Sequence, residues 1–209
     1  MINMDSKGFS PDKSKGFEHI EQIIAPFTSS TRAVRILRPW ELKKLLKAIP
    51  RKTSKTQFEF LLYTGMRYVE AKEIIKRRDL FDGNNIHLTP AFIRKPKCKI
   101  KDRYVKLSPV GVKVAENYFD NNKLLPHHNT WRENLERWAL LAKIDPSYMS
   151  TKTTRKTWES YLIFTYPHLR DAIFVSQGHT ELVALRNYVN LPFTQQDKDD
   201  MRKFVAGWE

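Results

Sequence analysis

Apolar residues recur at intervals of three and four along most of the chain, which predicts a mainly helical protein. The clearest run follows Pro39, whose fixed φ suits the first position of a helix. One face of this helix carries four apolar residues at positions i, i+3, i+4 and i+7: Leu42, Leu45, Leu46 and Ile49. Similar spacing and capping signals predict further helices over 53–64, 67–77, 167–177, 181–190 and 195–206. Three more helices are predicted to begin at Pro109, Thr130 and Ser150. Thr130 and Glu133 form a capping-box pattern.

The pattern changes between residues 79 and 107, where turn residues and short alternating runs replace the helical spacing. Turn signals at 82–85 separate segments that read as strands, which are predicted over 86–88, 91–93 and 103–107. We therefore expect an α+β fold, a mainly helical domain with one small antiparallel sheet inserted after the third helix. Residues 1–34 contain glycine, proline and a Ser/Thr cluster and are expected to form a tail or linker, with the compact domain over 35–209.

Positive charge is the most informative part of the composition. The chain has 37 Lys and Arg against 23 Asp and Glu, a formal net charge of +14. Much of it lies in two segments: residues 94–106 hold seven cations and one acid, and residues 35–55 hold eight cations and one acid. A surplus concentrated in this way predicts a polyanionic partner, most often a nucleic acid.

Several classes of protein are excluded by what the sequence lacks. One cysteine cannot form a disulfide framework, and no Cys/His spacing, Gly-rich phosphate loop or HExxH motif suggests a metal or nucleotide site. The longest apolar runs are only a few residues, far short of a membrane span. We expect a soluble protein of a reducing compartment that needs no cofactor, binds no metal and has no membrane partner.

A Thr-Gly-x-Arg turn, Thr64 to Arg67, is the first candidate site. Gly65 permits a sharp turn, and Arg67 then sits at the start of the next helix, where a planar guanidinium and the helix N-terminus both favour a phosphate. Glu70, three residues later, lies on the same helix face and could hold that guanidinium in place.

Three more candidates follow along the chain. Lys152 and Arg155 are spaced i, i+3 on a predicted helix, so both side chains reach one site. Gly178 and His179 form a second candidate, and Tyr188, nine residues after His179, is the third. Each has a plainer interpretation taken alone, as a surface arginine, a capping histidine or a core tyrosine.

Taken in order, these residues resemble the tyrosine recombinase (phage-type integrase) family over residues 35–209. That family's pattern is an arginine, a lysine on a β-hairpin, His/Lys-x-x-Arg, Gly-His, and a tyrosine nine positions on. Lys152 stands where most members have histidine, a feature that resembles the integrases of archaea and their viruses. The resemblance implies the family's mainly helical catalytic domain with a small antiparallel sheet.

The resemblance also implies roles for individual residues. Tyr188 would attack a DNA phosphate and form a 3′-phosphotyrosyl bond, Arg67 and Arg155 would clamp the phosphate, and Glu70 would support Arg67. His179 and Lys152 would make further phosphate contacts, and Lys97 would protonate the leaving 5′ oxygen. DNA contacts are expected from five other basic residues: Lys95, Lys99, Lys101, Arg103 and Lys156. The implied partner is double-stranded DNA at attachment or recombination sites, bound by a homo-oligomer in the cytoplasm with the nucleoid, or in the host cell if the protein is viral.

Some alternatives stay open on the sequence alone. Lys95 and Lys99 compete with Lys97 for the hairpin position, and Tyr161 or Tyr166 would be the next candidate nucleophiles after Tyr188. His168-Leu169-Arg170 is one residue short of the His-x-x-Arg spacing and is rejected. A truncated or inactive integrase-derived DNA-binding module remains an alternative function, because no evident core-binding domain precedes residue 35. A type IB topoisomerase-like nicking-closing enzyme remains another, because it shares this chemistry.

Overall fold

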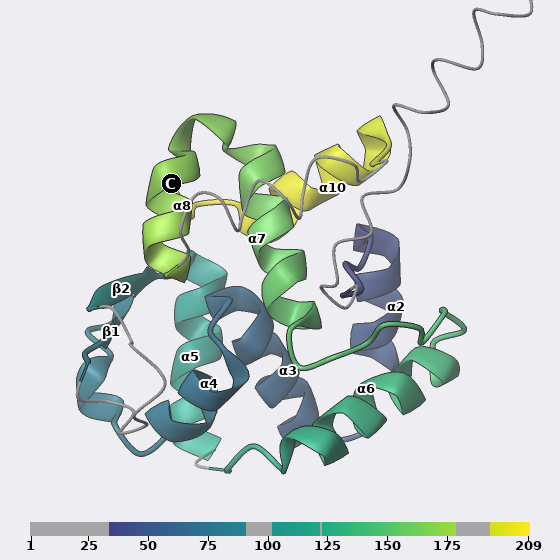
Figure 1. Ribbon diagram of the computed structural model, residues 1–209, viewed down its shortest axis with the longest axis horizontal. Helices are drawn as coiled ribbons and strands as arrows, with labels where there is room; N and C mark the ends of the chain where they lie inside the picture. Colours follow the sequence, from purple (N-terminus) through teal and green to yellow (C-terminus); the bar gives the residue numbers. More distant parts are fainter. Residues whose placement is uncertain (1–33, 91–101, 122, 179–192) are drawn as a thin grey trace, which may run out of the picture. The chain divides into compact units, whose positions relative to one another are not determined.

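The computed structural model describes residues 34–90, 102–121, 123–178 and 193–209, and these are mostly helical (Figure 1). The helices are α2 (Pro39–Ala48), α3 (Lys52–Thr64), α4 (Tyr68–Ile74), α5 (Pro109–Asn121), α6 (His128–Leu141), α7 (Thr153–Thr165), α8 (Arg170–Gln177) and α10 (Gln195–Val205). Two short 3-10 turns, η1 (Arg78–Leu80) and η2 (Pro167–Leu169), connect some of them. The predicted α+β fold is confirmed, whereas the strand predicted over 91–93 and the helix predicted over 181–190 lie outside the described residues.

Helix α3 forms the centre of the core, with α5 packed on one side of it and α7 on another. Its Phe60 ring stacks on Tyr118 of α5, with 3.8 Å between the ring centroids. Tyr63 meets Trp158 of α7 edge-on, with 5.5 Å between the centroids. Because aromatic side chains bury large apolar areas, these contacts bind three helices that are distant in the sequence into one core.

The sheet has two antiparallel strands, β1 (Asn85–Leu88) and β2 (Arg103–Lys106). Leu88 pairs with Arg103, and Ile86 pairs with Val105. Residues 103 and 105 are buried while 104 and 106 are exposed, since successive side chains of a strand point to opposite faces. One face of β2 therefore packs inward, and α8 lies against it.

The C-terminal helix α10 packs on α7 and α2. Asp197 at its N-terminus forms an ion pair with Arg38 (3.0 Å), and the Tyr166 hydroxyl donates to the Val205 carbonyl (3.2 Å). Beyond the helix, the Trp208 indole N–H donates to the Lys106 carbonyl at the end of β2 (3.1 Å). These contacts fix the described end of the chain to both the helical core and the sheet.

Three predicted helix starts are wrong. The helix predicted over 167–177 begins at Arg170, because residues 167–169 form η2. The other two starts are displaced by local side-chain bonds. Helix α6 begins at His128, because His127 caps it by accepting the Asn129 N–H at its Nδ1 atom (3.4 Å), so Thr130 and Glu133 lie inside the helix. Helix α7 begins at Thr153, because Ser150 occupies the turn before it and donates its N–H to the Thr153 hydroxyl (2.9 Å). In both cases a local side-chain bond moved the boundary by two or three residues.

Gly65→Ala is expected to destabilise the fold strongly. Gly65 has φ +58°, and a Cβ there would lie 2.5 Å from Gln177 Oε1 and 2.8 Å from Trp158 Cδ1. We expect the free energy of unfolding in urea to fall by about 2–5 kcal/mol, because alanine is strained in the left-handed backbone conformation and its Cβ is crowded by neighbouring atoms. Gly83→Ala is the control, because Gly83 also has positive φ but no atom within 4 Å of a Cβ. Equal losses in the two variants would contradict the crowding.

Candidate active site

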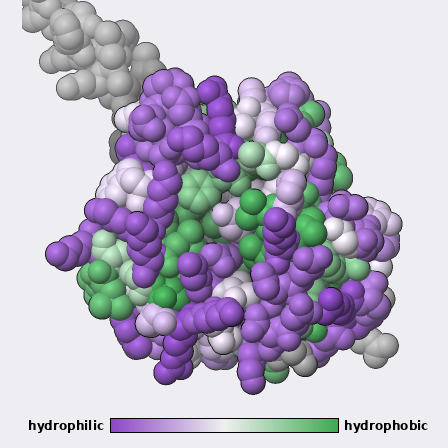
Figure 2. Space-filling model, turned by 180° about the vertical axis from the view of Figure 1, so that it is seen from behind, coloured by the Kyte–Doolittle hydropathy of each residue, from purple (hydrophilic) through white to green (hydrophobic). Residues whose placement is uncertain are grey.

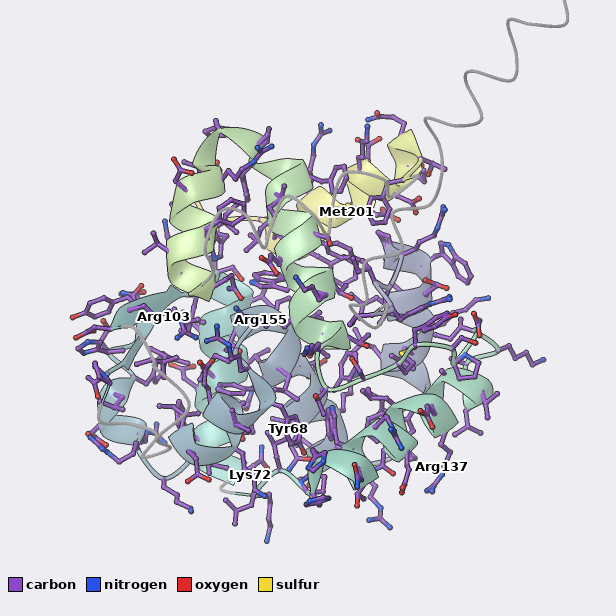
Figure 3. The ribbon with its side chains drawn as sticks, viewed as in Figure 1. Tyr68, Lys72, Arg103, Arg137, Arg155 and Met201 are labelled. Carbon is purple, nitrogen blue, oxygen red and sulfur yellow. The ribbon has the colours of Figure 1, made fainter. Side chains whose placement is uncertain are left out.

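Three arginines from three different elements meet at the C-terminal end of α8. Three consecutive carbonyls there each accept a hydrogen bond from a different guanidinium: Ser176 from Arg103 Nε (3.1 Å), Gln177 from Arg155 Nη2, and Gly178 from Arg67 Nη2 (3.0 Å). The last carbonyls of a helix lack partners within the helix and form its negative pole, so they attract cations. Figure 3 shows Arg103 and Arg155 near this end of α8. The arrangement fixes both the guanidinia and the backbone that leads directly to position 179.

Arg67 is held firmly and yet remains open to solvent. Its backbone N–H and its Nη1 atom donate to the two carboxylate oxygens of Glu70, each at 2.8 Å. The Arg67 side chain is 43% exposed, whereas that of Glu70 is 1% exposed. This is the ion pair that the sequence spacing suggested. A fixed, exposed guanidinium at a helix N-terminus is suited to binding an anion.

The Glu70 carboxylate keeps its negative charge in spite of burial. Burial alone would raise the pKa of the Glu70 carboxyl, but the guanidinia of Arg103 and Arg67 and the Arg67 N–H outweigh it and hold that pKa below its ordinary value. The carboxylate therefore stays a double acceptor for the two arginines across the neutral range.

Arg155, near the start of α7, is nearly as buried as Arg103. Its Nη1 atom donates to the Gly65 carbonyl (2.7 Å), so the side chain bridges the turn before α4 and the end of α8. Burial, with a smaller contribution from the nearby Arg67 charge, lowers the pKa of Arg155 to about 10. It therefore remains protonated at neutral pH, as a cation with little water around it, where an electrostatic interaction with a ligand is strongest.

The other predicted residues divide into exposed and buried ones. Lys152 is exposed and caps α7 three positions before Arg155. Arg103, expected to contact DNA, has a side chain that is 2% exposed. Its Nη2 and Nε donate to the Glu70 carboxylate and the Ser176 carbonyl, and its Nη1 is buried without a hydrogen-bond partner among the described residues. The Lys156 side chain is 12% exposed, with Nζ 3.5 Å from Glu159 Oε2. Each of the two side chains is paired with a buried glutamate, and their expected DNA contacts stay predictions.

Six predicted site residues lie outside the described residues: Lys95, Lys97, Lys99, Lys101, His179 and Tyr188. Their neighbours in the chain are described. Strand β2 begins two residues after Lys101, and His179 directly follows the carbonyl that binds Arg67.

The two alternative tyrosines are both buried, and each hydroxyl donates to a backbone carbonyl. The Tyr161 hydroxyl donates to the Leu37 carbonyl (2.9 Å) inside the core, and burial raises its pKa well above the ordinary value. The Tyr166 hydroxyl donates to Val205, as described above, and Tyr166 is also buried. The rejected His168 lies in η2, beyond the far end of the thirteen-residue α7, about 20 Å along the helix from its start.

The described residues offer neither a metal site nor a membrane span. Among them, no group of three or more His, Cys, Asp and Glu side chains is arranged to hold a metal ion, and no helix is long and apolar enough to cross a membrane. The face turned away from the view of Figure 1 is mostly hydrophilic, with apolar residues visible in the hollows (Figure 2).

The fold defined by these elements is that of tyrosine recombinase catalytic domains. The chain is similar to the crystal structure of XerA recombinase, with a TM-score of 0.58 and 19% identity over 85% of this chain and 67% of XerA. It is also similar to XerH site-specific recombinase bound to palindromic difH substrate in a post-cleavage complex, with a TM-score of 0.56 and 18% identity over 87% of this chain and 55% of XerH. For XerH in a pre-cleavage complex with difH substrate, the TM-score is 0.54 and the identity 18%, over 83% of this chain and 53% of XerH. The chain therefore spans about half the length of XerH. No protein-family model and no curated protein sequence matches it.

Proposed function

We propose that this chain is the catalytic domain of a tyrosine site-specific recombinase, which cleaves and rejoins double-stranded DNA through a 3′-phosphotyrosyl intermediate. The observation that carries the proposal is the attachment of Arg67 and Arg155 to the last carbonyls of α8, immediately before His179. Two guanidinia fixed this way can bind one phosphate, and Tyr188 follows His179 at the family's spacing. The relation to archaeal and viral integrases, suggested by Lys152, stays a prediction.

In the proposed reaction the Tyr188 oxygen forms a bond to phosphorus while the bond from phosphorus to the 5′ oxygen breaks. The tyrosine hydroxyl loses its proton, and the leaving 5′ oxygen gains one, which Lys97 is proposed to supply. Arg67 and Arg155 donate to the non-bridging oxygens, where negative charge grows in the transition state. His179 and Lys152 add hydrogen bonds to the same phosphate.

Strand joining is the reverse of this step. Because the phosphotyrosyl bond conserves the energy of the phosphodiester, a 5′ hydroxyl of another strand can displace Tyr188 without ATP. Recombination exchanges strands between two duplexes, so the proposal includes a homo-oligomer assembled on DNA recombination sites.

The test is capture of the covalent complex. Purified protein is incubated with a pool of nicked duplexes of randomised sequence, in which the cleaved end diffuses away and traps the intermediate. We expect DNA that stays attached in SDS and can be sequenced to give the site, with EDTA making little difference. Binding without any attached DNA would refute the enzyme in favour of a DNA-binding module, and plasmid relaxation without site preference would favour a topoisomerase.

The hairpin lysine is tested with a substrate whose bridging 5′ oxygen is replaced by sulfur, a leaving group that needs no proton. Lys97→Ala is expected to slow cleavage of the oxygen substrate by about 10²–10⁴-fold and to recover most of that loss with sulfur. Lys152→Ala, the control on α7, should show an intermediate defect with weak rescue. Rescue of Lys95→Ala or Lys99→Ala instead, measured in single-turnover reactions, would move the general acid by two residues.

A further inference from the structure

Arg103 contacts the same Glu70 carboxylate that holds Arg67, and it shares the oxygen Oε2 with the Arg67 backbone N–H. Glu70 Oε1 accepts from Arg67 Nη1 and Glu70 Oε2 accepts from Arg103 Nη2, each at 2.8 Å. Arg103 and Glu70 are buried, with side chains 2% and 1% exposed, whereas Arg67 is 43% exposed. The carboxylate thus connects a buried, immobile arginine to one that faces solvent.

The same arginine also supports the second contact of Arg67. Arg103 Nε donates to the Ser176 carbonyl, two residues before the Gly178 carbonyl that accepts from Arg67. A Cβ at Gly178 would lie 3.0 Å from Arg103 Nε and 3.1 Å from its Cζ, so the glycine allows the guanidinium to lie directly under this backbone. Both partners of the Arg67 guanidinium, the carboxylate and the helix end, therefore rest on Arg103.

We infer that Arg103 is a positioning residue that holds the Arg67 guanidinium in its phosphate-binding orientation through Glu70 and the end of α8. Arg103 Nε and Nη2 already donate to the Ser176 carbonyl and the Glu70 carboxylate, so its proposed effect on the phosphate passes through Arg67. An arginine side chain has many rotamers, and a loose guanidinium contributes less to a transition state than one already in place. The effect on cleavage rests on the proposed function, but the effect on Arg67 itself does not.

The first variant is Arg103→Met, which keeps the apolar stem of the side chain and removes the guanidinium, including the two donating atoms Nε and Nη2. Its matched control is Arg35→Met. Arg35 Nη2 donates to Glu41 Oε1 (2.5 Å), and Glu41 is the same kind of buried glutamate, accepting the Arg38 N–H at 2.8 Å at the start of α2. Each variant removes one guanidinium from a buried carboxylate that caps a helix. Only in Arg103→Met is that carboxylate also a partner of Arg67.

Two measurements are made on each folded variant. The NMR order parameter of the Arg67 Nε–H bond, assigned by its loss in Arg67→Lys, is expected to fall in Arg103→Met and to stay at the wild-type value in Arg35→Met. The single-turnover rate of covalent complex formation is expected to fall about 10–100-fold in Arg103→Met, while DNA affinity stays within about threefold. Arg103→Lys keeps the charge but cannot bridge Glu70 and Ser176, and it should recover part of both losses.

The two measurements separate the two proposals. An Arg67 order parameter that is the same in Arg103→Met and the wild type overturns the positioning role, whatever the cleavage rate does. Absence of covalent complex from the wild-type protein overturns the proposed function, while the order parameter still decides the role of Arg103. If Arg103→Met does not fold, an undiminished order parameter in Arg103→Lys overturns the inference.

Discussion

Tyr188→Phe is expected to abolish covalent attachment of the protein to DNA and to leave duplex binding nearly unchanged. The substitution removes one hydroxyl, the proposed nucleophile, and keeps the ring. Attachment is measured as DNA retained on the protein in SDS after reaction with nicked duplexes, and binding is measured by fluorescence anisotropy.

The control for this result is an exposed tyrosine elsewhere on the domain. Tyr148→Phe also removes one accessible hydroxyl, since Tyr148 is 67% exposed, and it should leave attachment at the wild-type level. Covalent complex formed by Tyr188→Phe would contradict the assignment. Attention would then turn to Tyr104, which is 55% exposed on β2, because Tyr161 and Tyr166 are buried.

Arg155→Ala is expected to slow attachment by about 10²–10³-fold, and sulfur in the leaving position should not restore the rate. The lost group stabilises charge on the non-bridging oxygens, so a better leaving group does not replace it. Because the Gly65 and Gln177 carbonyls also lose their donor, the free energy of unfolding should fall by about 1–3 kcal/mol for each.

The rate is therefore measured below the unfolding temperature of the variant, in single-turnover reactions with both substrates. Arg137→Ala, at an exposed arginine of α6 (Figure 3), removes the same charge far from the α8 carbonyls and should change the rate less than about threefold. Full rescue of Arg155→Ala by sulfur would mean that Arg155 serves proton transfer instead.

Local sequence signals predicted most of the fold. Pro39 and Gly65 marked the start of α2 and the end of α3, as the structure has them. The third helix ends at Ile74, earlier than its predicted end at residue 77, and the chain turns through η1 before the sheet. Starts set by a histidine cap or by a serine turn were missed, because these bonds depend on geometry that residue types alone do not specify.

The candidate site was predictable in its members and less so in its geometry. The spacing of Arg67 and Glu70 already suggested their ion pair, since it lies within one helical turn. The basic run predicts a DNA contact for Arg103, whereas its alternation with Val105 and Leu107 predicts a place on the inward face of a strand, where the structure has it. The carbonyls of α8 carry no sequence signal, because their role arises only when three distant segments meet.

The crowding of arginines at the end of α8 links folding to ionic strength. Among the described residues, three arginines donate to this end of the helix (Arg67, Arg103 and Arg155), and Glu70 is the carboxylate that pairs with two of them, so positive charge in this group exceeds negative charge by two. Folding brings these like charges together, and added salt screens their repulsion. The same salt competes with DNA phosphates for the cations. Rising ionic strength should therefore raise the unfolding temperature of the free protein while weakening its complex with DNA, two opposite responses with one electrostatic origin.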